Sequence, residues 1–244
     1  MPRFFVTDGI QTDKPLVLTG DSASHAHVLR LRIGDEICVC DGQGQDYMGT
    51  ICEMNSRSLT VQITSSQLCP GEPTLQCSVY MAFPKADKLE HVIQKATELG
   101  AYEIVTFPTA RSVSRPDASS LIKKQERWQK IAQSASEQSQ RGRIPQVVVL
   151  SSFQDALQRA SHSDISILLY ENEKQHSLRS VLTASSFRTI SLFSGPEGGL
   201  TPEEVQWAQE AGLHICSLGP RILRCETAPL CSLSAVLYAS GQLE

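Results

Sequence analysis

Two patterns of hydrophobic and polar positions divide the 244-residue chain near residue 70. In the first part, short apolar runs are separated by turn residues such as Gly34-Asp35 and Gly42-Gln43-Gly44. These runs lie at 15–18, 36–40, 47–53 and 59–63. Short strands at this spacing predict a small β-barrel. Residues 22–31 instead have the pattern of a short helix, and residues 68–73 predict a linker because two prolines and a glycine oppose regular structure.

From residue 74 onward, apolar runs alternate with helical patterns. Strands are predicted at 75–83, 102–107, 147–150, 165–170, 189–193 and 214–218. Helices are predicted at 87–99, 117–140, 177–184, 202–211 and 228–240, with one more between the strand at 147–150 and about residue 161. This alternation predicts an α/β fold with a mostly parallel sheet covered on both faces. We therefore expect two domains, residues 1–70 and residues 74–244.

Ligands of such sheets bind beyond the carboxyl ends of the strands, so the loops 171–176, 194–200 and 219–227 are candidate binding loops. The loop from Ser194 to Leu200 lets a ligand approach its main chain, because it contains Gly195, Pro196, Gly198 and Gly199. It differs from a P-loop, since the lysine of that motif is absent and Glu197 would repel phosphate. A cationic or polar ligand is favoured instead. After it, Thr201 and Glu204 predict a capping box, with Pro202 at the first helical position.

The loop from Leu218 to Ala228 also lies between a strand and a helix. Gly219-Pro220 forces a sharp turn, and the apolar Ile222 and Leu223 indicate that this loop contacts a ligand or partner. Arg224 and Glu226 follow, and on spacing alone they could equally form a surface ion pair that contributes less than about 1 kcal/mol. The third loop, which follows Leu169-Tyr170-Glu171, carries little information by itself.

Charge and cysteine content limit the class of protein. The formal net charge is -4, but residues 111–143 contain eight basic and three acidic side chains, or 8 - 3 = +5. This stretch is either a solvated helix face or a contact for RNA phosphate. The eight cysteines include no C-x-x-C pair, so we expect no metal. The N-terminus lacks a signal-peptide pattern and no apolar run could span a bilayer, so we expect a cytoplasmic protein without membrane contact.

The residues from Ser194 to Leu200 and from Leu218 to Ala228 resemble the C-terminal signature of the SPOUT methyltransferases. More narrowly, the chain resembles the ribosomal RNA small subunit methyltransferase E family over nearly its whole length. Further matching segments are residues 2–6, 27–32, 85–90, 94–100, 111–112 and 127–139. One departure is Cys225, where the family pattern has threonine.

The resemblance implies a PUA-like β-barrel for RNA followed by a SPOUT-type α/β domain with a C-terminal trefoil knot. It implies a homodimer with the active site near the subunit interface. It also implies transfer of a methyl group from S-adenosylmethionine to N3 of a uridine in 16S ribosomal RNA, within the 30S subunit.

Residue roles follow from these two loops and the resemblance. Arg224 is expected to stabilise the developing uridine anion. Glu226 or Glu197 is expected to accept the imide proton, or Glu226 to orient Arg224, and the sequence leaves these alternatives open. Donor-binding candidates are Leu169, Tyr170, Glu171, Ser194, Gly195, Pro196, Glu197, Gly198, Gly199, Leu218, Gly219, Ile222, Leu223, Cys225, Thr227 and Ala228. RNA-binding candidates are Arg3, Arg30, Arg32, Arg111, Arg141 and Arg143.

Three other functions were weighed. A ribose 2'-O-methyltransferase would use the same donor loops with a different acceptor. A non-catalytic RNA-binding protein would use only the barrel and the basic stretch, and the intact donor loops disfavour it. A nucleotide-binding dehydrogenase is disfavoured because no G-x-G-x-x-G follows any predicted strand.

Overall fold

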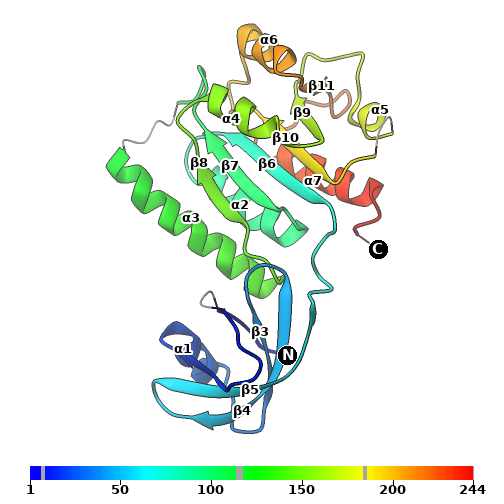
Figure 1. The fold of residues 1–244 in the computed structure, drawn as a ribbon. Helices are drawn as coiled ribbons and strands as arrows, with labels where there is room; N and C mark the ends of the chain where they lie inside the picture. The colour runs from blue at the N-terminus through cyan, green and yellow to red at the C-terminus, as the bar shows by residue number, and fades with distance from the viewer. Residues whose placement is uncertain (7–8, 114–117, 184–185, 244) are drawn as a thin grey trace. The chain divides into compact units, whose positions relative to one another are not determined.

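A five-stranded sheet forms the first of two units into which the chain divides (Figure 1). The structure is a computed structural model that describes residues 1–6, 9–113, 118–183 and 186–243. The strands are β1 (Arg3–Phe5), β2 (Leu16–Thr19), β3 (Glu36–Cys40), β4 (Gln45–Met54) and β5 (Ser58–Leu68), in the order β1-β3-β4-β5-β2. β1 is parallel to β3, and the other neighbours are antiparallel. The single helix described in this unit's N-terminal segment is α1 (Asp21–Val28).

Differences from the predicted elements of this unit have local causes. β1 was not predicted, because three residues are too few for a period-2 pattern; it pairs Phe4 with Val39. β5 runs to Leu68 because β4 and β5 form one long hairpin. α1 ends at Val28, before the predicted residue 31, and Arg30 follows with a positive φ of 58°. Side chains from all five strands, together with α1, form the core of this unit.

A second segment, residues 136–144, belongs to the first unit together with residues 1–72. The sequence had placed it in the second domain. The amide of Gly44 donates to the carbonyl of Gly142, and Arg141 forms an ion pair of 2.8 Å with Glu72. Glu72 also accepts from the amides of Gly142 and Arg143. These contacts are long-range in sequence, so no local pattern predicts them.

The second unit contains residues 73–135 and 145–243 and has a six-stranded sheet. Its elements are β6 (Gln76–Ala82), α2 (Lys88–Leu99), β7 (Glu103–Phe107), α3 (Ala118–Gln138, whose last turn belongs to the first unit), β8 (Gln146–Val149), α4 (Phe153–Ala160), β9 (Ile165–Leu169), α5 (Leu178–Leu182), β10 (Thr189–Ser194), α6 (Pro202–Glu210), β11 (His214–Cys216) and α7 (Thr227–Ala239). The strand order is β11-β9-β10-β6-β7-β8. All neighbouring strands are parallel, which confirms the predicted α/β class.

Burial on both faces explains why the strands of this sheet read as continuous apolar runs. β9 is buried at every position. Tyr80 and Phe193 stack with ring centroids 4.3 Å apart, and Phe107 and Phe153 stack at 5.5 Å, so aromatic packing joins β6, β10, β7 and α4. Among the described residues, no helix has the length and apolar character to cross a bilayer. Arg115 and Asp117, which were counted in the basic stretch, lie outside the described residues.

Candidate active site

A cavity of about 940 Å³ lies in the second unit where β9, β10 and β11 end. This is the edge of a parallel sheet at which ligands bind, and the volume is in the range of small-molecule sites. All three candidate loops contribute to it. The lining residues are Lys88, Leu169, Tyr170, Glu171, Glu173, Lys174, Ser194, Gly195, Pro196, Glu197, Gly199, Leu200, Ser217, Leu218, Gly219, Pro220, Arg221, Ile222, Leu223, Arg224, Cys225 and Ala228.

The loop after β10 is held in place from three directions. Nη1 of Arg111 donates to the carbonyls of Gly198 at 2.9 Å and Leu200 at 3.3 Å. The backbone amide of Lys85 donates to both carboxylate oxygens of Glu197, at 3.0 and 3.3 Å. The predicted capping box of Thr201 and Glu204 is present and begins α6 directly after the loop. The loop backbone is therefore preorganised for a ligand.

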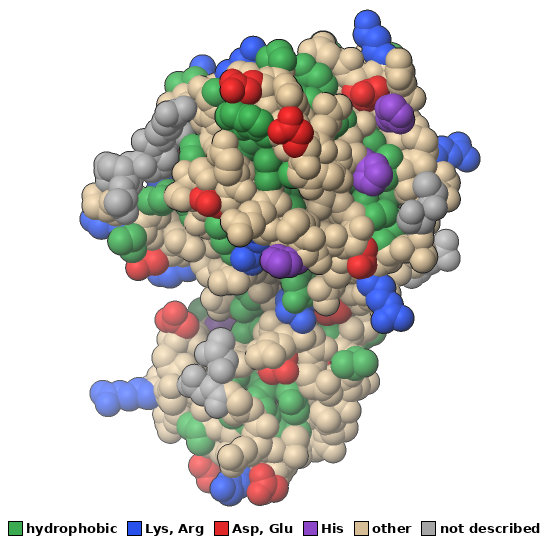
Figure 2. Space-filling view, turned by 45° about the horizontal axis from the view of Figure 1, so that its top comes forward, with side chains coloured by type: hydrophobic (Ala, Val, Ile, Leu, Met, Phe, Trp, Pro, Cys, Tyr) green, Lys and Arg blue, Asp and Glu red, His purple; other side chains and the backbone are tan. Residues whose placement is uncertain are grey.

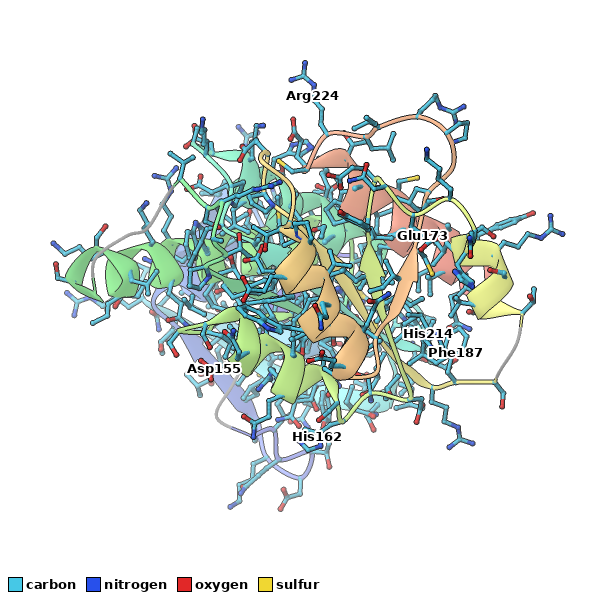
Figure 3. The ribbon with its side chains drawn as sticks, turned by 90° about the horizontal axis from the view of Figure 1, so that it is seen from above. Asp155, His162, Glu173, Phe187, His214 and Arg224 are labelled. Carbon is cyan, nitrogen blue, oxygen red and sulfur yellow. The ribbon has the colours of Figure 1, made fainter. Side chains whose placement is uncertain are left out.

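The loop after β11 exposes its apolar and basic side chains. Ile222 is 82% exposed, although it lines the cavity. The carbonyl of Arg224 accepts hydrogen bonds from the amides of Thr227 and Ala228, which begins α7. The side chain of Arg224 extends away from the loop into solvent (Figure 3), and its guanidinium has no partner among the described residues. It is thus available to an incoming anion.

Lys88 connects the two loops and was not assigned a role from the sequence. Its Nζ lies 3.0 Å from Oε1 of Glu197 and 3.2 Å from Oε2 of Glu226. The Cys225 thiol donates to Oε2 of Glu226 at 3.2 Å. One sequence feature could have indicated this role: a lysine in the first turn of a helix is unfavourable for the helix dipole and calls for a nearby anion.

Glu197 and Glu226 are both held in their ionised forms. Burial alone would raise the pKa of Glu197, but hydrogen bonds from its own amide, from Lys88 and from the amide of Lys85 hold that pKa below its ordinary value. Burial also opposes ionisation of Glu226, yet its own amide, the Cys225 thiol and Lys88 hold its pKa below the ordinary value. The hydrogen bond to Glu197, joined by that to Glu226, raises the pKa of Lys88. All three groups are therefore charged at neutral pH.

Most donor-binding candidates lie at this cavity. Gly198 and Thr227 are the two that do not line it. Of the three catalytic candidates, Glu197 and Arg224 line it, while Glu226 lies behind Lys88. Seven further residues line the cavity and were not among the predicted site residues: Lys88, Glu173, Lys174, Leu200, Ser217, Pro220 and Arg221. Apart from Lys88, these residues flank predicted site residues in the same loops. Their nearness to the motifs was therefore the only sequence signal that they line the cavity.

The six arginines predicted to bind RNA fall into two groups. Arg141 is buried and the side chain of Arg3 is 11% exposed, and they form ion pairs with Glu72 and Asp46, so the structure does not support a phosphate contact for either. Arg111 holds the loop after β10.

Arg30 and Arg32 are exposed, and Arg143 donates to the carbonyl of Gln43 through one nitrogen. On the face drawn in Figure 2, basic side chains of the described residues are scattered among acidic ones.

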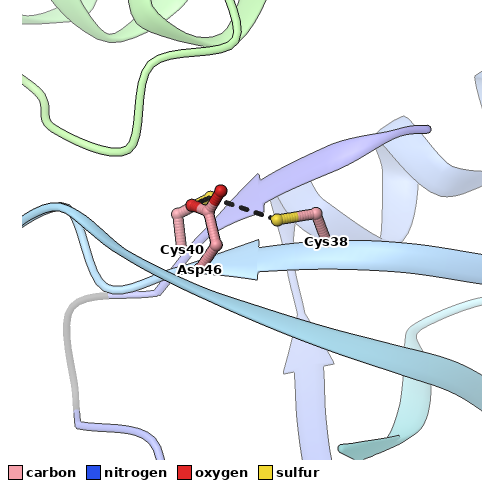
Figure 4. Close-up of side chains that lie close together, drawn as sticks. All are labelled: Cys38, Cys40 and Asp46. Atoms are coloured by element: carbon pink, nitrogen blue, oxygen red, sulfur yellow. Dashed lines mark hydrogen bonds between the residues drawn. The ribbon is translucent and has the colours of Figure 1, made fainter. Parts of the chain in front are cut away.

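Three side chains of kinds that can ligate a metal lie together in the first unit (Figure 4). Ligand atoms of Cys38, Cys40 and Asp46 lie within 4.8 Å of one another. Arg3 already places a cation there: its Nη1 donates to Oδ1 of Asp46 at 2.6 Å and to Sγ of Cys40 at 2.8 Å. A bound metal would have to displace the guanidinium, so the prediction of no metal is kept.

Family models match both parts of the chain. The model described as RNA methyltransferase domain matches residues 71–237, and the model described as RNA methyltransferase PUA domain matches residues 18–64. The first covers the residues that line the cavity, and the second covers most of the five-stranded sheet.

Relatives extend over the whole chain. Ribosomal RNA small subunit methyltransferase E of Bacillus subtilis is 39% identical, over 100% of this chain and 98% of that protein. The structure of the same enzyme from Neisseria gonorrhoeae bound to S-adenosylmethionine is 29% identical, with a TM-score of 0.88 over 98% of this chain and 97% of that one. A methyltransferase structure from Legionella pneumophila with bound S-adenosylmethionine is 27% identical, with a TM-score of 0.85 over 97% of both chains. The chain therefore belongs to the RNA methyltransferase family that includes the ribosomal RNA small subunit methyltransferase E proteins.

Proposed function

We propose that this protein transfers the methyl group of S-adenosylmethionine to N3 of a uridine in 16S ribosomal RNA. The observation that carries the proposal is the cavity beyond β9, β10 and β11, lined by the two signature loops, in a chain of this family. The relatives of known structure from Neisseria gonorrhoeae and Legionella pneumophila hold S-adenosylmethionine.

The cavity suits this donor in shape and charge. Its lining combines apolar side chains such as Leu169, Leu218 and Leu223 with carboxylates and basic groups. S-adenosylmethionine has an apolar and aromatic adenosine part and an amino-acid part with charges of both signs. Gly195 and Gly199 also line the cavity and add no side chain to it. These residues would hold the donor, which supplies an electrophilic methyl group when bound.

The protein residues then have to stabilise the acceptor. The imide proton of uridine N3 is released to water before or during the attack, so negative charge develops transiently on the base. Arg224 is suited to stabilise that charge, since its guanidinium extends into solvent from the loop beside the donor. Glu197 and Glu226 are both engaged by Lys88, which favours an orienting role for them over proton acceptance.

We propose that the protein is a homodimer that uses α7 as part of its interface. From Thr227 to Ala239 the helix has no charged residue, yet only one side of it is buried in the chain. A helix that is apolar on all sides is normally covered on all sides. Tyr238 is 72% exposed and Cys231 is also exposed, so a second copy of this helix would cover them.

The expected trefoil knot is supported by the path of the chain near α7. β11 pairs with β9 at the edge of the sheet, whereas α7, which follows it, packs against β10 and β6. The segment between β11 and α7 therefore returns past the end of β9. We propose that this return completes the knot.

The first unit is proposed to bind the RNA, because the PUA model matches it. Arg30, Arg32 and Arg143 are the remaining candidates for phosphate contacts in that unit. We also propose that the substrate is 16S ribosomal RNA in the 30S subunit and that the protein is therefore cytoplasmic.

Nucleoside mass spectrometry tests the proposal. Small-subunit RNA and intact 30S particles are incubated with the purified protein and labelled S-adenosylmethionine, then digested to nucleosides. We expect labelled 3-methyluridine. Labelled 2'-O-methyl nucleosides would support the proposed donor site but show that the acceptor is the ribose 2'-oxygen and not N3. The absence of label in both substrates would favour the non-catalytic alternative.

A further inference from the structure

Lys88 joins the first turn of α2 to both signature loops of the donor cavity. Glu197 lies in the loop after β10, and Glu226 immediately precedes α7. These two segments are separated along the chain, yet a carboxylate oxygen from each lies close to Nζ of Lys88. The distances are 3.0 Å to Glu197 and 3.2 Å to Glu226. The side chains are only partly exposed, at 30% for Lys88, 26% for Glu197 and 20% for Glu226. Solvent therefore screens this network less than it screens a pair on the open surface.

The local structure around Lys88 is unfavourable unless the two carboxylates are present. A cation in the first turn opposes the helix dipole, and Asp87 at the N-cap position makes no side-chain capping bond. Ala86 has a positive φ of 52°, a conformation that non-glycine residues rarely adopt. This turn nevertheless directs two donors, the amide of Lys85 and Nζ of Lys88, to one carboxylate of Glu197. The strained backbone of Ala86 and the charge of Lys88 therefore stabilise the contact with the two loops and do not stabilise α2 itself.

Without Lys88, two ionised carboxylates would face each other across the edge of the cavity. Like charges at this distance repel, and neither Glu197 nor Glu226 would then hold its loop against α2. The donor loops would lose the arrangement that forms one wall of the cavity.

We infer that Lys88 is a positioning residue that clamps the two signature loops together for donor binding. The inference rests on the proposed function, since it takes S-adenosylmethionine as the ligand of the cavity. It also gives Glu197 and Glu226 their role: they are the two ends of the clamp and do not accept the uridine proton.

A purely electrostatic role for Lys88 would have a different signature from a clamp. S-adenosylmethionine has one more positive charge than its product, S-adenosylhomocysteine. If Lys88 acted only through its charge, its removal would favour the cationic donor and leave the product unaffected. If Lys88 holds the loops, its removal weakens the binding of both ligands by a similar factor.

The test is calorimetric measurement of both dissociation constants with the full-length protein. For Lys88→Met we expect both constants to rise about tenfold, in the range measured for coupled side chains. Lys88→Arg, which can still reach two carboxylates, should stay within about threefold of wild type. Lys95→Met is the matched control, because it removes a lysine of the same helix that pairs with Glu98 and contacts neither loop. Tighter binding of the donor alone, or equal losses in Lys88→Met and Lys95→Met, would overturn the clamp.

Two further measurements distinguish the loss of the clamp from a general loss of folding. In a Glu226→Gln background, Lys88→Met should weaken binding by much less than tenfold, because one end of the clamp is already uncharged. Hydrogen exchange of the free protein should be faster at 195–200 and 219–226 in Lys88→Met and unchanged in Lys95→Met. Unchanged exchange at both loops in Lys88→Met would also overturn the clamp.

These results separate the clamp from the proposed function. If wild-type protein binds the donor but forms no 3-methyluridine, the acceptor assignment fails and the clamp is still judged by the binding constants. If wild-type protein binds neither ligand, both proposals fail.

Discussion

Oε1 of Glu171 lies 2.7 Å from the position that a Cβ atom on Gly199 would occupy. Glu171 follows β9 and Gly199 belongs to the loop after β10, so the two loops meet at the floor of the donor cavity. Gly199 also has a φ of +66°. Both the backbone conformation and the close carboxylate therefore require glycine at position 199.

Gly199→Ala should weaken donor binding. The new Cβ would displace Glu171 and strain the loop by about 1 kcal/mol, and we expect the dissociation constant of S-adenosylmethionine to rise about tenfold. Gly212→Ala is the control, because Gly212 has a φ of +85° with no atom within 4 Å of the added Cβ. It should cost similar thermal stability and leave donor binding intact. Equal binding losses in the two variants would show that strain alone is responsible.

Arg224→Ala should lower turnover by about 100-fold, which is the usual effect of losing one well-placed charge stabiliser. Donor affinity should stay within about threefold of wild type, because the guanidinium extends into solvent. Single-turnover methylation of 30S particles and calorimetry of the donor measure the two quantities. Arg188→Ala changes an exposed arginine outside the cavity, and as the control it should leave both quantities unchanged. The role of Arg224 is wrong if its variant turns over within about threefold of wild type.

Cys225 should react slowly with iodoacetamide. Burial, followed by the hydrogen bond to Glu226, raises the pKa of this thiol to about 12. The reactive thiolate is therefore scarce at about pH 8, and its share rises about tenfold per pH unit until about pH 12. Peptide mass spectrometry should find the exposed Cys52 modified well before Cys225. Equal labelling rates at about pH 8 would contradict the hydrogen-bonded thiol.

Asp46→Ala should destabilise the protein by about 3 kcal/mol, because it removes the buried anion of the pair and leaves the largely buried guanidinium of Arg3 without it. Urea unfolding followed by circular dichroism measures this loss. Glu53→Ala removes an exposed carboxylate of the same strand, β4, and should change stability by less than about 0.5 kcal/mol. If Asp46→Ala were as stable as wild type, the ion pair would not be structural and Arg3 would again be a candidate for RNA contact.

Tyr238→Glu should convert the proposed dimer to a monomer, because it places a charge on the exposed apolar face of α7. Light scattering coupled to size exclusion gives the mass in solution. Ile122→Glu changes an exposed apolar residue of α3 and should leave the mass unchanged. A monomeric wild-type protein would remove the basis for this interface.

Much of the second unit could be predicted from local pattern. The α2 helix buries Leu89, Val92, Ile93 and Ala96, at the spacing of one helix face. Its strands are apolar throughout because both faces of the sheet are covered. The capping box at Thr201 and Glu204 is a contact within four residues, so the sequence alone contains it.

The sequence by itself determined which loops line the cavity beyond β9, β10 and β11, because the carboxyl ends of parallel strands must meet at one edge of the sheet. Only the tertiary structure decided what the charged residues do. The pattern suggests Arg3 and Arg141 as RNA-binding residues, whereas the structure pairs them with the carboxylates of Asp46 and Glu72, and Lys88 had no assigned role. An ion pair depends on which side chains folding brings within about 4 Å, and residues more than 40 positions apart have no periodicity that reports it.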